Sequence, residues 1–283
     1  MVQVVGAARA AHRNIGCSGR AVMMSSDVPQ PALSIIIPAY NEERRIGATL
    51  ERVTRYLDAR RNGYELIVVD DGSRDATRET VARVTGDHPC VRLLAMPQNA
   101  GKGAAVRTGV LASRGGAVLF SDADLSTPIE ELERLEAALA EGADVAIGSR
   151  AAPGEVLRRQ PLLRRLQGRG FHLAVRALGF RVVAAIRDTQ CGFKLFRGPV
   201  ARVLFRELTL TGFAFDVELL ELAHRRFELR EVPVAWNHAD GSKVRPGIDA
   251  ARMLRDLVRI RWGWLRNGRP MPALPVGDGW GPR

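Results

Sequence analysis

Two acidic pairs lie where hydrophobic runs of the sequence end. Asp70 and Asp71 follow one such run, and Asp122 and Asp124 follow another. If both runs are parallel strands of an open α/β sheet, their carboxyl ends share one edge and the four carboxylates meet in one crevice. Asp122 and Asp124 can then both turn toward a hard divalent cation, which takes oxygen ligands. The pattern predicts a metal-bound diphosphate, although either pair alone is as typical of an ordinary turn after a strand.

Two loops add groups that suit a nucleotide. The first hydrophobic run ends in a loop where a base or ribose could be bound, at Pro38, Tyr40, Asn41 and Glu42. A glycine-rich segment containing Gly101 and Lys102 opens a later helix, and a helix N-terminus beside a lysine attracts phosphate. Neither loop matches the P-loop or the G-x-G-x-x-G fingerprint. Kinases, ATPases and dinucleotide dehydrogenases are therefore disfavoured.

The elements that must position these residues alternate along the chain. The hydrophobic periodicity predicts strands at residues 33–37, 64–70, 91–96, 117–121 and 144–147. Helices are predicted at residues 42–59, 74–84, 102–113 and 127–141. The last of these has Thr127 as N-cap, Pro128 at the first helical position and Glu130 three residues after the cap. Such repeats predict a three-layer α/β fold with a mostly parallel central sheet.

The second half of the chain is less regular and strongly basic. Helices are expected near residues 199–205 and 215–226, a strand at 229–236, and a basic amphipathic helix at 248–265. Residues 155–187 carry eight arginines against a single acid, which predicts an anionic partner. Lysine is rare among the 42 basic residues, so the positions that keep it indicate a need for a compact point charge: Lys102, Lys194 and Lys243.

Length and composition are those of an ordinary globular enzyme. The 283 residues are 46% hydrophobic, and no apolar run reaches the ~18 to 20 residues that cross a bilayer. Three cysteines are too few for a disulfide framework or a zinc site. We expect residues 1–31 to be a disordered extension, a transit peptide, or a stretch before a start at Met23 or Met24. One catalytic domain is expected at 32–247, followed by the basic helix and a loose tail at 248–283.

Taken together, the sequence resembles the family 2 glycosyltransferases of the GT-A fold. The matching segments are residues 38–42, 70–73, 99–103 and the D-x-D motif at 122–124. Further segments resemble the dolichyl-phosphate β-glucosyltransferase branch, whose relatives include the polyprenyl-phosphate mannose synthases. These segments are residues 148–150, 188–196, 213–220 and 241–243. The resemblance runs from about residue 33 to residue 265 and implies a GT-A Rossmann-like fold.

The resemblance implies inverting transfer of a sugar from a nucleotide diphosphate, expected to be UDP-glucose, to a polyprenyl phosphate. It places Asp70 and Asp71 at the base and ribose, and Mg²⁺ or Mn²⁺ on Asp122 and Asp124. In the mannose synthases a Gln just after the D-x-D also helps to bind metal. Here Ser126 stands at that position, so Gln190 is the candidate third ligand.

The acceptor phosphate needs cations to position it. A phosphomonoester is largely ionised at neutral pH, so no strong general base is required. The candidate phosphate-binding cations are Arg150, Arg158, Arg159, Lys194 and Lys243. We expect the chemistry itself to depend on Asp122, Asp124, Arg150 and Lys243. Asp188 could orient a sugar hydroxyl, and Asp216 could be no more than a partner of its helix dipole.

A lipid acceptor also predicts contact with a membrane surface. The basic helix at 248–265, with Trp262 and Trp264, could lie on anionic lipid at the cytoplasmic face, or could instead pack on the core. Three alternatives remain open: a GDP-mannose-dependent synthase, a sugar-nucleotide pyrophosphorylase and a nucleic-acid-binding protein. The glycine-rich signature that a pyrophosphorylase carries at its first strand does not occur at that position in this sequence. The arginines lack interleaved aromatic residues, so we expect no nucleic-acid partner.

Overall fold

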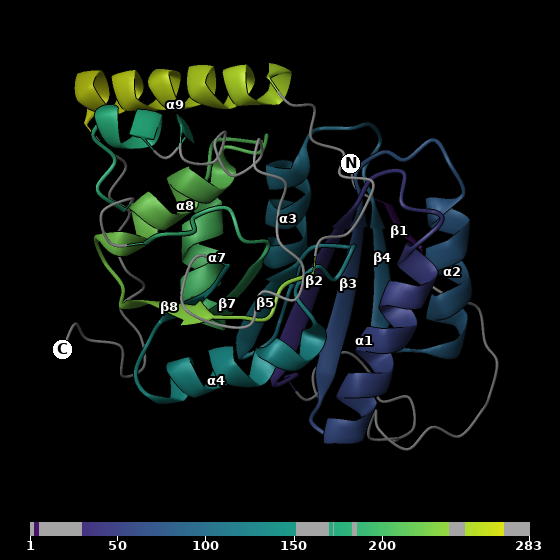
Figure 1. The fold of residues 1–283 in the computed structure, drawn as a ribbon. Coiled ribbons are helices and arrows are strands. Elements are labelled where there is room, and N and C mark those ends of the chain that lie inside the picture. The colour runs from purple at the N-terminus through teal and green to yellow at the C-terminus, as the bar shows by residue number, and fades with distance from the viewer. Residues whose placement is uncertain are drawn as a thin grey trace.

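A single central sheet organises the molecule (Figure 1). The computed structural model describes residues 3–5, 30–150, 170–171, 173–182, 186–237 and 247–268. The eight strands lie side by side in the order β1 (Gln3–Val5), β4 (Val91–Ala95), β3 (Tyr64–Asp70), β2 (Leu33–Ala39), β5 (Ala117–Ser121), β7 (Phe193–Arg197), β6 (Val145–Ser149) and β8 (Leu229–Pro233). Strands in the middle of this order are buried on both faces, as in a sheet covered by helices on each side.

The helices form a layer on each face of the sheet. One layer contains α1 (Ile46–Arg60), α2 (Thr77–Asp87) and α4 (Leu132–Ala140), preceded by a 3₁₀ turn at Ile129–Glu131. The other contains α3 (Lys102–Leu111), α7 (Gly198–Glu207) and α8 (Phe215–His224). Each layer buries its own hydrophobic core against the sheet, so the predicted three-layer α/β fold is confirmed.

The strand directions are mostly parallel, with one inserted exception. β4, β3, β2 and β5 run parallel, as do β6 and β8. β7 lies antiparallel between β5 and β6, and its Phe193 pairs with Ser121. This strand was not expected from the sequence, because a five-residue run interrupted by Lys194 resembles a loop motif. Its insertion brings residues 188–192 to the end of β5, beside the D-x-D segment.

Two further expectations are corrected. Residues 1–31 were expected to lie outside the fold, but Gln3–Val5 pairs antiparallel with β4 as an edge strand. Thr127 was expected to cap a helix, but the 3₁₀ turn begins at Ile129 with no side-chain cap. The Thr127 hydroxyl is buried and lies 3.9 Å from the Cys191 Sγ instead.

The last helix, α9 (Ile248–Asn267), lies across the outside of the layer that contains α8 (Figure 1). Its inner face buries Leu257, Ile260 and Trp264, and the Trp264 ring meets Phe180 edge-on with centroids 5.8 Å apart. Trp262, by contrast, is 62% exposed. The two tryptophans were expected to share one role. They face opposite ways, because residues two positions apart on an α-helix are separated by about 200° around its axis.

Among the described residues, no helix combines the length and the hydropathy that crossing a bilayer requires.

Candidate functional site

The first acidic pair holds the loops at the carboxyl edge of the sheet. Asp70 is fully buried at the end of β3, where it pairs with Arg78 and accepts a hydrogen bond from the Ser73 amide at 3.1 Å. Asp71 accepts hydrogen bonds from the amides of Ala100 and Gly101 at 2.7 and 2.9 Å. Burial raises the pKa of Asp71 above its usual value, although these two amides oppose the change. Both carboxylates thus have protein partners, and their direct contact with base and ribose stays a prediction.

The loop after β2 is fixed against the loop after β3. Asn41, with a φ of 54°, accepts a hydrogen bond from the Arg74 amide at 2.9 Å, and its own amide donates to the Ser73 hydroxyl. The Glu42 amide donates to the Thr77 hydroxyl at 2.8 Å. A pocket of about 430 Å³ opens between these loops, lined by residues 41–45 with Arg74 and Asp75. Two of the predicted nucleotide residues, Asn41 and Glu42, therefore line a cavity of ligand size.

The second acidic pair meets the glycine-rich segment. The Lys102 Nζ, on the first residue of α3, lies 2.8 Å from Asp122 Oδ1 and 5.1 Å from the centre of the Phe120 ring. Burial by itself lowers the pKa of Lys102, but the carboxylates of Asp122, Asp216 and Asp124 raise it above its ordinary value. Lys102 is therefore an ammonium at neutral pH. The structure thus brings the D-x-D motif and the lysine of the glycine-rich segment into direct contact, a pairing that was not predicted from the sequence.

The backbone around the D-x-D motif is held from three sides. The Asp122 amide donates to the Gly192 carbonyl at 3.0 Å, and the Thr49 hydroxyl of α1 donates to the Ala123 carbonyl at 2.6 Å. Asp124 turns back to accept a hydrogen bond from the Ser126 amide at 2.9 Å. A Cβ at Gly192 would lie only 1.9 Å from Asp122 Oδ2. The Asp122 carboxylate thus occupies a space that exists because residue 192 has no side chain.

Two half-buried carboxylates on a fixed turn are a donor set that suits Mg²⁺ or Mn²⁺ carried with a diphosphate. Mg²⁺ is usually held by one or two carboxylates together with substrate phosphates, and not by a full protein cage. The described residues contain no group of three or more His, Cys, Asp or Glu that could hold a metal ion. Gln190 has a buried amide nitrogen without a partner, but metals bind the amide oxygen. Its ligand role stays a prediction.

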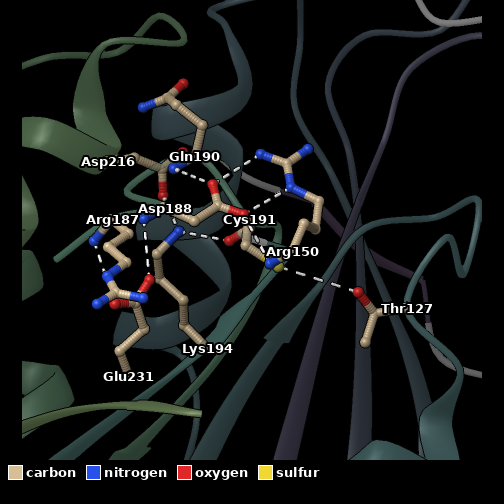
Figure 2. A network of polar contacts seen from close by, with 9 residues as sticks. All are labelled: Thr127, Arg150, Arg187, Asp188, Gln190, Cys191, Lys194, Asp216 and Glu231. Atoms are coloured by element: carbon tan, nitrogen blue, oxygen red, sulfur yellow. Dashed lines mark hydrogen bonds and ion pairs between the residues drawn. The ribbon is translucent and has the colours of Figure 1, made fainter. Parts of the chain in front are cut away.

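Arg150 and Asp188 form a two-pronged ion pair (Figure 2). Arg150 Nε and Nη2 donate to the two Asp188 oxygens, each at 2.7 Å, and the Arg150 guanidinium lies over the Trp236 ring. Burial alone would raise the pKa of Asp188, but Arg150 lowers it below its usual value. Glu231 holds the same segment by accepting hydrogen bonds from the amides of Arg187 and Asp188. Arg150 is thus a fixed cation at the site edge.

Lys194 points into the protein interior and not toward a site for the acceptor phosphate. Its side chain is fully buried, and its Nζ donates to Asp216 Oδ1 and to the Cys191 carbonyl, each at 2.6 Å (Figure 2). Burial raises the pKa of Asp216, against the opposing effect of Lys194. The expectation that Lys194 binds the acceptor phosphate is therefore wrong for this structure, because the inserted strand β7 turns its side chain into the interior. Asp216, in turn, is more than a helix-dipole partner.

Several residues that shape the site had no structural role predicted from the sequence, although Glu218 and Gly192 lie in the segments that resemble the family. Glu218 accepts hydrogen bonds from the amides of Thr209 and Leu210, which fixes the loop against which Gly101 packs. Glu231 holds the amides of residues 187 and 188, and Gly192 leaves space for the Asp122 carboxylate; neither role follows from a local sequence signal. The remaining acceptor candidates lie outside the described residues: Arg158, Arg159 and Lys243.

Comparison with known proteins adds relatives over most of the chain. Residues 34–204 match the profile described as Glycosyl transferase family 2. A dolichyl-phosphate beta-glucosyltransferase of Drosophila melanogaster is 41% identical over 255 residues, covering 85% of this chain and 76% of that protein. A human protein of the same description is 37% identical over 254 residues, covering 84% and 78%.

Solved structures show the same fold at lower identity. Glucosyl-3-phosphoglycerate synthase from Mycobacterium tuberculosis, in complex with Mn²⁺, UDP and glucosyl-3-phosphoglycerate, superposes with a TM-score of 0.61. The two proteins are 22% identical, and the match covers 85% of this chain and 81% of that one. The same synthase with Mn²⁺ and UDP-glucose gives a TM-score of 0.59 at 21% identity.

Proposed function

Because the chain belongs to glycosyltransferase family 2, with the GT-A fold, we propose that it transfers glucose from UDP-glucose to dolichyl phosphate or a related polyprenyl phosphate. The observation that carries the proposal is the 37 to 41% identity to dolichyl-phosphate beta-glucosyltransferases over most of both chains. The arrangement of Lys102, Asp122 and Asp124 at the carboxyl edge of the sheet agrees with it. A GDP-mannose-dependent synthase and a nucleic-acid-binding protein are not favoured.

The donor half of the site is built to hold a diphosphate. The N-terminus of α3 and the Lys102 ammonium provide positive charge for phosphate oxygens, and Asp122 and Asp124 would hold Mg²⁺ or Mn²⁺. When bound, the metal offsets negative charge on the departing nucleotide. The loop residues Asn41 and Glu42 would contact the nucleoside. Asp71 fixes the glycine-rich segment before α3 by accepting hydrogen bonds from the amides of Ala100 and Gly101.

The acceptor brings its own nucleophile. In an inverting displacement, a phosphate oxygen of the lipid forms a bond to the anomeric carbon while the bond from that carbon to the UDP oxygen breaks. The lipid phosphate is already ionised, so no side chain has to remove a proton. Arg150, held by Asp188, would help to position that phosphate. We keep Arg158, Arg159 and Lys243 as its other proposed contacts.

The lipid acceptor requires the enzyme to meet a membrane, and α9 offers a suitable surface. Leu254, Val258, Trp262 and Leu265 form an apolar stripe on its outer face, exposed by 38, 45, 62 and 66%. Exposed arginines border the stripe at positions 255 and 259. A helix with an apolar face edged by arginines binds at the interface of anionic bilayers. We propose that this stripe rests on the membrane, at the cytoplasmic face.

Donor and acceptor screening tests the proposed activity. The purified chain is incubated with UDP-glucose, GDP-mannose or other nucleotide sugars, together with dolichyl phosphate and Mn²⁺ or Mg²⁺, and the lipid product is identified by mass. We expect a hexose adduct with UDP-glucose and not with GDP-mannose. Product from GDP-mannose alone would contradict the donor assignment, and no lipid adduct with any donor would contradict the acceptor assignment.

Membrane docking is tested by vesicle co-sedimentation. We expect binding to vesicles that contain anionic lipid. Binding should weaken at high salt, because salt shortens the Debye length over which the arginines attract the lipid. It should also weaken after R255E and R259E substitutions, which replace attraction by repulsion. Binding that ignores salt and both charge reversals would reject docking through α9.

A further inference from the structure

Lys102 and Asp122 form an ion pair where a metal is expected. The Nζ–Oδ1 distance is 2.8 Å, and the two side chains are 20 and 35% exposed. The start of α3 cannot shift easily, because Gly101 has a φ of 102° and a Cβ there would lie 2.5 Å from the Thr211 carbonyl oxygen. The Lys102 backbone is therefore fixed, while its four-carbon stem leaves the ammonium free to move. A bound divalent cation and this ammonium would compete for the same carboxylate.

The charges around the pair favour either an empty site or a fully loaded one. Lys194 and Asp216 are buried and neutralise each other at 2.6 Å. Lys102 then balances one of the two D-x-D carboxylates. A divalent cation alone would make the site net positive and would push against the Lys102 ammonium at close range. A diphosphate alone would be repelled by both carboxylates. Metal and diphosphate together restore a net negative charge close to that of the empty site.

We propose that Lys102 couples metal binding to donor binding. In the empty site its ammonium occupies Asp122, and when a diphosphate arrives it transfers to the phosphate oxygens, which frees Asp122 for the divalent cation. Free metal therefore binds weakly, and metal and nucleotide bind together. This inference rests on the proposed function for the identity of the donor, and it assigns to Lys102 a role in regulating occupancy as well as in phosphate contact.

The coupling makes a reciprocal prediction. If UDP tightens Mn²⁺ binding by some factor, Mn²⁺ must tighten UDP binding by the same factor. Part of that factor comes from direct contact between the metal and the diphosphate, which does not involve Lys102. The remainder should disappear when the ammonium is removed, because Asp122 is then free in the absence of UDP as well.

Binding measurements without any sugar donor test the proposal. Free Mn²⁺ is followed by its electron paramagnetic resonance signal, with and without UDP, and a titration lacking protein corrects for Mn²⁺ bound to UDP in solution. The variants are Lys102→Met, which keeps the stem over Phe120 without the charge, and Lys102→Arg, which keeps the charge. Arg55→Met, an exposed change on α1, is the control for loss of one positive charge.

For Lys102→Met we expect about tenfold tighter Mn²⁺ binding in the absence of UDP, the scale of one charge-assisted contact. The factor by which UDP improves Mn²⁺ binding should fall about tenfold. Lys102→Arg should bind Mn²⁺ alone no more tightly than the unaltered chain, and Arg55→Met should match it throughout. A Lys102→Met coupling factor within threefold of the original would overturn the proposal while leaving the donor site intact. If the unaltered chain binds neither Mn²⁺ nor UDP, the proposed function fails with it.

Discussion

Replacing Gly192 by alanine should disable the site without harming the fold. The added Cβ would lie 1.9 Å from Asp122 Oδ2, 2.2 Å from its Cγ and 2.6 Å from its Oδ1. Since non-bonded atoms need about 3.5 Å, the carboxylate must move by roughly 1.5 Å. Metal–ligand distances are held within about 0.2 Å, so Asp122 would be lost as a ligand. Gly192 does not have a positive φ, so alanine strains no backbone there.

The expected magnitudes follow from that displacement. Turnover should fall at least ~10²-fold, as for the loss of a major electrostatic stabiliser. The affinity for Mn²⁺ in the presence of UDP should fall roughly 10- to 100-fold, the usual cost of disturbing a group that orients a ligand. The free energy of unfolding should change by no more than about 1 kcal/mol. The Lys102–Asp122 pair is partly exposed, and the Asp122 carboxylate can rotate away from the added methyl group.

Three assays on the same preparation decide the matter: glucosyl transfer, Mn²⁺ binding with UDP, and urea unfolding. Gly86→Ala is the matched control, since a Cβ at this position in α2 would have nothing within 4 Å. It should keep full activity and gain up to about 1 kcal/mol from its better helix propensity. A folded Gly192→Ala protein with rate and Mn²⁺ affinity within threefold of the original would refute the reasoning.

Three further predictions concern the metal carboxylates, the two tryptophans and the buried thiol. Asp122→Asn or Asp124→Asn should lower the transfer rate at least ~10²-fold with an unchanged circular dichroism spectrum. Near-normal turnover in EDTA would contradict the metal assignment. Trp264→Ala should cost about 3 to 5 kcal/mol of stability in urea unfolding, because the ring is buried against Phe180. Trp262→Ala should cost under 1 kcal/mol but weaken vesicle binding, and the reverse pattern would mean that the faces of α9 are misassigned. Burial raises the pKa of the Cys191 thiol from 9.0 to about 11. The unfolded chain therefore loses this proton first as pH rises, and stability falls from pH 9 toward 11. Relative to Cys191→Ala, the original chain should lose roughly 2 kcal/mol between pH 8.5 and 10.5, and parallel pH curves would speak against a buried neutral thiol.

The sequence by itself determined the strands and helices of the first half and where their acidic residues stand. Hydrophobic periodicity and turn residues are local signals, so the ends of β3 and β5 could be placed, and with them Asp70 and Asp122. The family resemblance also followed from short contiguous motifs. Parallel strands share one carboxyl edge by topology alone, which is why both acidic pairs could be expected at that edge of the sheet.

Only the tertiary structure decided which of these residues face the site. β7 enters antiparallel beside β5, and strand pairing depends on partners far away in the sequence. That pairing sets Gly192 against Asp122 and buries Lys194 on Asp216, so a lysine that the sequence offered as a phosphate contact becomes an internal counter-ion. On α9, nothing in the sequence distinguishes Trp262 from Trp264 as the exposed or the buried residue. Which of them is buried depends on packing against Phe180, and that contact exists only once the chain has folded.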